Sequence, residues 1–184
     1  MADSSPRLVS VQRGRVRDLG NWTTAFLKEP VLGPVWVESR GVQGDQHADP
    51  RFHGGLEKAV LAYSAEHYPA WRAELGLPDM PFGAFAENLT IAGLDETSVR
   101  LGDVFDIGEA RLQVTQPRGP CVKIARHWER RDLTARVIRT GRTGWYLRVL
   151  IEGHVEPGDP VRLVERLDGT PSVAEAIAAR LAAR

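Results

Sequence analysis

Short apolar segments separated by glycine, proline and aspartate recur along the chain, and this spacing limits the fold more than any other feature. The candidate strands lie within residues 7–19, 34–39, 58–63, 87–93, 99–116, 143–153 and 159–167. Period-two alternation, which is typical of strands, runs through Ala110, Leu112 and Val114, and again through Trp145, Leu147, Val149 and Ile151. Many short strands with glycine turns predict a mainly β fold, a closed or nearly closed barrel with a few short peripheral helices.

Three segments have helical patterns. Residues 64–76 offer Ser64 as N-cap and Gly76 as stop, although Pro69 must kink the helix or delay its start. Residues 132–141 begin at a capping Asp132 and end at Gly141. The tail helix over 172–184, capped by Ser172, has a narrow apolar stripe that needs another surface or another protein, so a homodimer is possible.

Composition restricts the protein class. The 184 residues fit one domain, and a formal charge of zero gives no reason to expect nucleic acid or an anionic membrane as partner. A single cysteine excludes an intrachain disulfide framework and a multi-cysteine zinc site. The first 20 residues have no apolar core of signal-peptide length, and no apolar run of about 18 residues occurs. We therefore expect a cytoplasmic protein.

The lone cysteine lies in QPRGPCVKIARHW, residues 116–128. Pro120 suits the first position of a helix, which would place Cys121 in the first turn, on one face with Ile124, Ala125 and Trp128. Free backbone amides there, together with Arg118 and Lys123, favour the thiolate, which is the form that attacks or binds a metal. The alternative is a small buried residue that only fills space.

A second cluster, GVQGDQHADPRFHGGLEK, covers residues 41–58. Asp45, His47, Asp49 and His53 are possible metal ligands, but the glycines and Pro50 also indicate a turn-rich structural loop, which we favour over a metal site. A third interpretation fits better: Gly54 and Gly55 allow close approach to a phosphate, with His53 and Lys58 as donors.

Two further motifs are weaker. In RTGRTGWYLRV, residues 139–149, glycines alternate with Arg139, Arg142 and Thr143, which can hold an oxyanion or form only a solvated connection. In PFGAFAENLTIAG, residues 81–93, Asn88 can present its amide to a ligand ring or simply cap a turn.

Taken in order, these motifs resemble the MOSC domain family, named after the C-terminal domain of molybdenum cofactor sulfurases, and most closely its bacterial stand-alone YiiM-like branch. The resemblance covers roughly residues 8–167, and it is most specific at QPRGPC, FHGG and TGWY. It implies a MOSC β-barrel over 1–167, related to the pyruvate kinase barrel, and a helical tail over 168–184 that is shorter than the helical domain of many YiiM-like members.

The resemblance also implies a ligand, the molybdenum cofactor (molybdenum bound by molybdopterin), in a surface cleft. Cys121 corresponds to the family's protein ligand to molybdenum, and is therefore the expected metal-binding and catalytic residue. The expected cofactor-binding residues are His53, Gly54, Gly55, Lys58, Asn88, Arg118, Lys123, Arg142 and Thr143. Members usually have glycine where this chain has Ala86, which matters only if the backbone there needs a positive φ.

The implied activity is reduction of small N-hydroxylated compounds, such as N-hydroxylated purine bases, to amines. No cysteine set exists for an iron–sulfur cluster, so a separate electron-donating reductase is the expected partner. His53, His127 and Asp45 are the candidate proton donors. Alternatives are a non-catalytic cofactor carrier, a sulfur carrier that uses a persulfide on Cys121, and a divalent-metal hydrolase that uses Asp45, His47 and His53.

Overall fold

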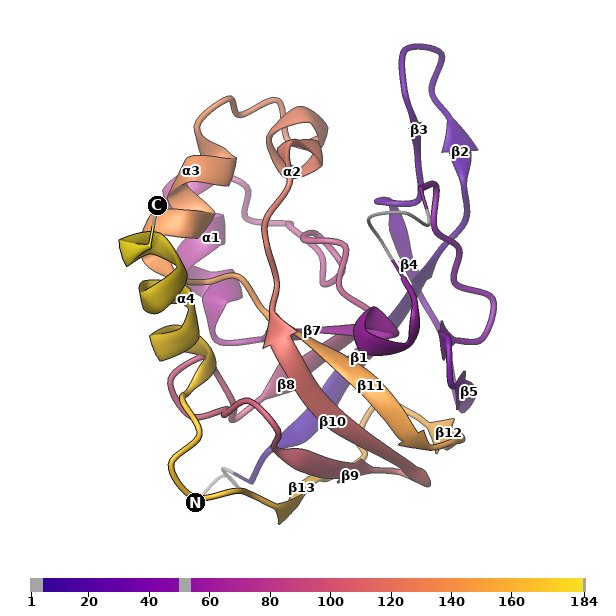
Figure 1. Ribbon diagram of the computed structural model, residues 1–184. Coiled ribbons are helices and arrows are strands. Elements are labelled where there is room, and N and C mark those ends of the chain that lie inside the picture. The colour runs from indigo at the N-terminus through magenta and orange to yellow at the C-terminus, as the bar shows by residue number, and fades with distance from the viewer. Residues whose placement is uncertain (1–4, 50–53, 184) are drawn as a thin grey trace.

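The computed structural model describes residues 5–49 and 54–183 and shows a coiled β-sheet capped by helices at one end (Figure 1). The strands are β1 (Arg7–Gly14), β2 (Arg17–Asp18), β3 (Thr23–Thr24), β4 (Lys28–Pro30), β5 (Val35–Glu38), β6 (Gly41–Val42), β7 (Val60–Ser64), β8 (Leu89–Ala92), β9 (Val104–Ile107), β10 (Ala110–Pro117), β11 (Trp145–Ile151), β12 (Gly153–Val155) and β13 (Val161–Glu165). The helices are η1 (Leu56–Lys58), α1 (His67–Leu75), α2 (Val122–His127), α3 (Leu133–Thr140) and α4 (Val173–Ala182).

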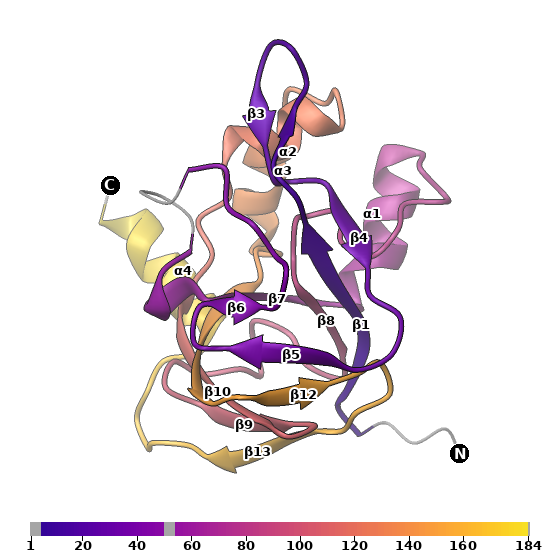
Figure 2. The same ribbon diagram turned by 90° about the vertical axis from the view of Figure 1, so that its right-hand side faces the viewer.

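The main sheet has eight strands in the order β13-β9-β10-β11-β7-β8-β1-β4. All neighbours are antiparallel except β7 and β8, which are parallel and are joined through α1. Strands β12, β5 and β6 form a second small sheet across the barrel, and β2 and β3 form a projecting hairpin (Figure 2). The mainly β fold predicted from the sequence is confirmed.

The barrel closes through a few bonds rather than through a full ladder. An isolated bridge joins Arg7, at the start of β1, to Pro160 beside β13. Leu8 N–H donates to the Asp159 carbonyl at 2.8 Å, and Val161 N–H donates to the Pro6 carbonyl at 2.9 Å. The main sheet is therefore open along most of its length, and only the starts of β1 and β13 are hydrogen-bonded across the gap.

Two apolar clusters stabilise this arrangement. One fills the barrel and includes the predicted inward residues Ala110, Leu112 and Val114. The alternation predicted for β11 holds at Trp145 and Leu147 but fails at its end, where Ile151 is 50% exposed. The second cluster packs α1, α2 and α3 together over one end of the barrel.

The helices differ from the sequence prediction at their starts. Ser64 ends β7 and donates its hydroxyl to Glu66, so it does not cap α1, which begins at His67 with Pro69 in its first turn. Asp132 precedes α3, but its carboxylate pairs with Arg136 instead of capping. The predicted stops at Gly76 and Gly141 are confirmed, since both adopt the left-handed conformation.

The tail helix is capped as predicted. Ser172 and Glu175 form a capping box at the start of α4. Val173 is fully buried, and Ile177 packs against the barrel cluster. Val173 and Ile177 therefore pack within this chain, whereas Leu181, at the end of the stripe, is 44% exposed. A homodimer stays a prediction.

The segment 83–88, which leads into β8, is organised by one buried carboxylate. Glu87 accepts hydrogen bonds from Gly83 N–H (2.7 Å), Phe85 N–H (3.1 Å) and the hydroxyl of Tyr68. This turn forces Ala86 to a φ of 64°, the left-handed region that disfavours a side chain. Ala86 therefore occupies a position that suits glycine.

We expect Ala86→Gly to raise the free energy of unfolding by about 0.5–1 kcal/mol, because relief of the left-handed strain exceeds the added entropy of the unfolded chain. Urea unfolding measures the change. Ala84→Gly is the matched control: Ala84 is buried without a positive φ, so its replacement should lower stability by about 1 kcal/mol. A loss of stability in both variants would contradict the strain at Ala86.

Candidate functional site

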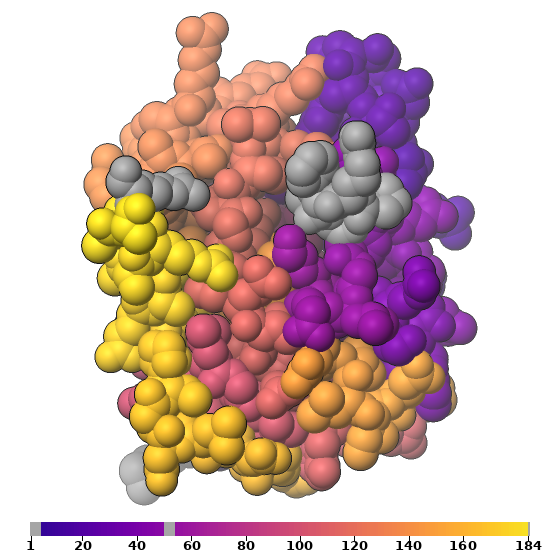
Figure 3. Space-filling view, in the orientation of Figure 1, coloured from indigo at the N-terminus to yellow at the C-terminus, as the bar shows by residue number. Residues whose placement is uncertain are grey.

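A cleft lies where the helical cap meets the barrel. Its walls come from the α2 segment, the η1 segment, the loop after β6 and the segment from Ala25 to Lys28. In the space-filling view, the α2 and η1 segments lie on the same face of the molecule (Figure 3). The lining residues that matter most are Lys28, His47, Lys58, Arg118, Cys121 and Lys123.

Cys121 lines this cleft and is half-buried. It is the N-cap residue of α2 in an extended conformation, so the helix begins two residues later than predicted and Pro120 lies outside it. Ile124 is buried in the helical cap, and the indole N–H of Trp128 donates to the Ala84 carbonyl at 2.9 Å. These contacts fix α2, and the carbonyl of Cys121 accepts from the Thr134 hydroxyl at 3.3 Å.

Arg118 enters the cleft from the end of β10. A register shift between Val114 and Gln116 bulges β10 just before it, and such bulges redirect the residues that follow. Its backbone N–H donates to the Gly144 carbonyl at 3.0 Å, and its side chain contacts Tyr146. The guanidinium is buried, and its Nη1 has no hydrogen-bond partner within residues 5–49 and 54–183.

All three lysines of the chain, among 24 basic residues, line this one cleft. Lys58 lies 5.9 Å from the centre of the Tyr146 ring, and Lys123 follows Cys121 in α2. Sequence reasoning identified Lys58 and Lys123 but missed Lys28. The only signal was the rarity of lysine itself, because Lys28 lies in no motif.

Lys28 forms a buried ion pair at the cleft wall. Its ammonium lies 2.5 Å from Asp45 Oδ1, and the two side chains are 6% and 2% exposed. Asp45 also accepts from Gly14 N–H at 2.6 Å and from the Asn88 amide at 2.9 Å. Burial lowers the pKa of Lys28 below its ordinary value, against the opposing effect of the Asp45 carboxylate.

Asn88 lines the cleft, but its amide is committed to the protein. Its Oδ1 accepts from Leu61 N–H at 3.1 Å, and its Nδ2 donates to Asp45 and to the Gln12 carbonyl. Asn88 therefore ties β7, β1 and the loop after β6 together. Asn88 would therefore support ligand binding by holding these elements in place, not by contacting the ligand with its amide.

The loop predicted to bind metal or phosphate is described only in part. His53 lies outside the described residues. His47 and Gly54 line the cleft, whereas Gly55 precedes η1 without lining it. Burial lowers the pKa of His47, assisted by Lys28 and opposed by Asp45. Within the described part of the chain, no group of three or more histidine, cysteine or acidic side chains is arranged to hold a metal ion.

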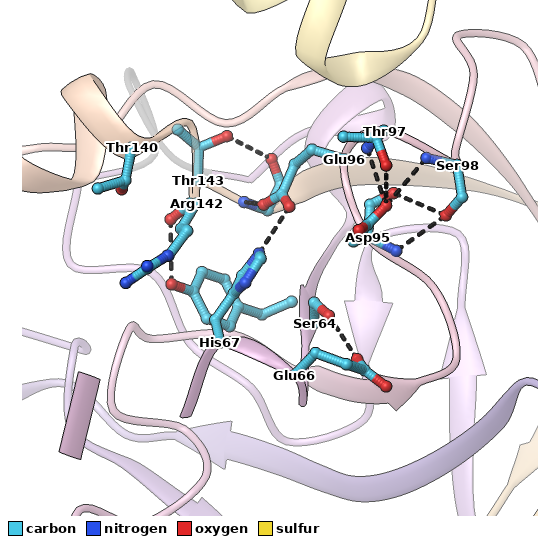
Figure 4. A network of polar contacts seen from close by, with 12 residues as sticks. Ser64, Glu66, His67, Asp95, Glu96, Thr97, Ser98, Thr140, Arg142 and Thr143 are labelled. Atoms are coloured by element: carbon cyan, nitrogen blue, oxygen red, sulfur yellow. Dashed lines mark hydrogen bonds and ion pairs between the residues drawn. The ribbon is translucent and has the colours of Figure 1, made fainter. Parts of the chain in front are cut away.

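Arg142 and Thr143 do not line the cleft with the other predicted residues. Arg142 pairs with Glu74 at 2.8 Å and stacks over Trp71, 4.8 Å from the ring centre. Thr143 is buried and donates to the Gly144 carbonyl. Both belong to a polar network around β7 and the start of β11 (Figure 4).

This network has a positioning role that the sequence did not reveal. Buried Glu96 accepts from Gly144 N–H at 2.7 Å, and its other oxygen lies 2.6 Å from His67 Nε2. Only glycine fits at 144, because an added Cβ would lie 2.4 Å from the Ala62 carbonyl. The Gly144 carbonyl in turn holds the backbone of Arg118, so the network fixes one wall of the cleft.

We expect Asp45→Asn to lower the free energy of unfolding by about 3 kcal/mol, because it leaves the buried Lys28 ammonium without its counter-charge. Urea unfolding at pH 7 measures the loss. Asp106→Asn is the control, since it breaks the partly exposed pair with Arg111 and should cost less than about 1 kcal/mol. Equal losses in the two variants would refute the special role of the buried pair.

Comparisons with known proteins identify the family of this chain. The family model for the MOSC domain matches residues 49–162. The uncharacterized protein YflK of Bacillus subtilis (strain 168) is 46% identical over 143 residues, which is 78% of this chain and 64% of YflK. A protein named reductase from Gibberella moniliformis is 40% identical over 165 residues, 86% of this chain but 29% of that protein. The chain thus spans less than two thirds of the length of either relative.

The fold is shared with a solved structure. The crystal structure of YiiM from Geobacillus stearothermophilus superposes with a TM-score of 0.79 at 38% identity, covering 94% of this chain and 82% of YiiM. Every helix that the structure describes is too short or too polar to span a lipid bilayer. The match over residues 49–162 and the likeness to YiiM together establish that this chain belongs to the MOSC domain family, as a YiiM-like member.

Proposed function

We propose that this protein binds the molybdenum cofactor in the cleft and reduces N-hydroxylated compounds to amines. The buried guanidinium of Arg118 is the observation that carries this proposal. Its Nη1 lacks a partner among the described residues while the side chain lines the cleft with Cys121. An unsatisfied buried charged donor is costly, so its retention indicates a site built for an anionic oxygen of a ligand.

The residues of the cleft fit this cofactor by their chemistry. The Cys121 thiolate is a soft ligand suited to a thiolate-binding metal. Arg118, Lys58 and Lys123 would hold the pterin and its phosphate, with Gly54 allowing close approach of the backbone. When bound, the cofactor supplies the two-electron redox chemistry, and the protein supplies binding, orientation and protons.

Reduction of a hydroxylamine group to an amine consumes two electrons and two protons and releases water, so the cleft must supply protons. Asp45 is held by Lys28, Asn88 and Gly14, and His127 packs against Phe26 with a ring-centre distance of 5.1 Å. Lys28 and His47 are the titratable groups with lowered pKa values that line the cleft. We propose Lys28 as the proton donor, since burial makes its ammonium a stronger acid than an exposed lysine.

A reductive activity also agrees with a named relative. The matched protein from Gibberella moniliformis is named a reductase, and most of its length lies outside the match. We propose that a separate electron-donating reductase supplies the electrons. We place that partner and the small N-hydroxylated substrate within the same proposal.

Cys121→Ser is expected to lose nearly all bound molybdenum, because a serine hydroxyl is a harder and weaker ligand than a thiolate. Both proteins are purified from a cofactor-producing host, and molybdenum is measured by elemental analysis per folded chain. A molybdenum enzyme of known metal content, prepared in the same host, controls for loading. Equal molybdenum in both proteins would mean that Cys121 is not the ligand. Stoichiometric molybdenum without reduction of N-hydroxyadenine by reduced methyl viologen would favour a carrier.

Arg118→Met separates binding from folding. The change removes a buried unsatisfied donor, so we expect the cofactor-free protein to be no less stable, while molybdenum content falls at least about tenfold. Urea unfolding and elemental analysis measure the two effects. Arg111→Met, on the barrel surface, should leave molybdenum content unchanged. Retention of full molybdenum by Arg118→Met would remove the main support for the proposed site.

A further inference from the structure

The charges of this neutral chain are strongly segregated. Residues 118–142 contain eight basic and two acidic residues, a formal charge of +6. Because the whole chain has a formal charge of zero, the other residues together carry −6. The basic segment begins at the cleft wall and continues through α2 and α3, which form a helical hairpin over one end of the barrel (Figure 1).

Packing directs the charges of this hairpin outward. Ile124, Leu133 and Val137 are fully buried in the cluster shared with α1, so the opposite side of the hairpin faces solvent. Arg130 and Arg131, in the connection between α2 and α3, are exposed and form no ion pair with any residue that the structure describes. The outer surface of the hairpin therefore keeps uncompensated positive charge.

This surface is close to the proposed redox centre. Helix α2 starts directly after Cys121, and its six residues rise only about 9 Å. Val122, next to Cys121, is 76% exposed and adds an apolar contact at the same end of α2. A protein docked on the hairpin would thus lie near the cleft.

We propose that the α2–α3 hairpin is the docking surface for an acidic electron-donor protein that carries a flavin or an iron–sulfur cluster near its own surface. This inference rests on the proposed function, because each conversion of a hydroxylamine to an amine and water needs two electrons and two protons. Complexes for electron transfer are small and transient, and their rates depend on charge complementarity. The negative remainder of the chain would repel the acidic partner elsewhere and so orient it.

An extended nucleic acid fits this surface less well. It would carry negative charge beyond the hairpin onto the acidic remainder of the molecule, where repulsion replaces attraction. A compact acidic protein domain can place its negative charge against the hairpin alone. The segregation of charge therefore favours the protein partner.

The test compares two double charge reversals that change the formal charge equally. Arg130→Glu with Arg131→Glu alters the hairpin, while Arg40→Glu with Arg162→Glu alters exposed residues of the barrel. Reduction of N-hydroxyadenine by the molybdenum-loaded proteins is measured with photoreduced ferredoxin, with reduced flavodoxin, and with reduced methyl viologen as a small donor. At about 20 mM salt, the hairpin variant should lose at least about tenfold in rate with an acidic protein donor and remain within about twofold with methyl viologen. The barrel variant should lose much less, and about 0.3 M salt should abolish the difference.

Equal losses in the two variants, or no selective loss with either protein donor, would overturn the docking surface. Absence of reduction even with methyl viologen would instead overturn the proposed function. In that case, docking is tested by direct binding to immobilised ferredoxin and flavodoxin at low salt. The proposal requires that the wild type binds and that the hairpin variant selectively loses this binding. Tighter binding of a fluorescent single-stranded DNA 20-mer than of either donor, lost in the hairpin variant, would assign the surface to nucleic acid and refute the proposal.

Discussion

The buried ion pair between Asp45 and Lys28 is the interaction on which the cleft depends. Asp45 accepts hydrogen bonds from β1 through Gly14 and from the start of β8 through Asn88, and it pairs with Lys28 at the start of β4. Three parts of the chain that are distant in sequence therefore meet at one carboxylate. Removal of that charge would leave a buried ammonium without compensation, so this pair stabilises the fold.

The cleft contains features that reduce stability. Ala86 has a backbone conformation that favours glycine, and Arg118 buries a donor that finds no partner in the described part of the chain. Lys28 carries its charge in a site where burial lowers its pKa. These destabilising features lie around the cleft, where a ligand is expected. The barrel and the helical cap are instead filled by apolar side chains. The function that we propose accounts for the unsatisfied Arg118; nothing in the structure explains the alanine at 86.

Sequence reasoning was successful where the signal is local. Most strands follow the apolar segments that predicted them, the stops at Gly76 and Gly141 are left-handed, and Ser172 caps α4. It was less successful at helix starts, because Ser64 and Asp132 use their side chains for other partners. In the cleft it found Cys121, Arg118, Lys58 and Lys123 from motifs, but not Lys28, which no motif marks.

The order of residues along the chain was enough to predict the mainly β class, the family resemblance and the cysteine at the centre of the candidate site, because periodicity, turn residues and motifs are properties of neighbouring residues. Which motifs meet in space followed only from the folded chain. Folding brings Lys28, His47 and Tyr146 into the cleft with Cys121 and leaves Arg142 paired with Glu74 outside it. Strand order, the bulge in β10 and the burial of Asp45 are set by contacts between residues far apart in the chain, and no local pattern encodes them.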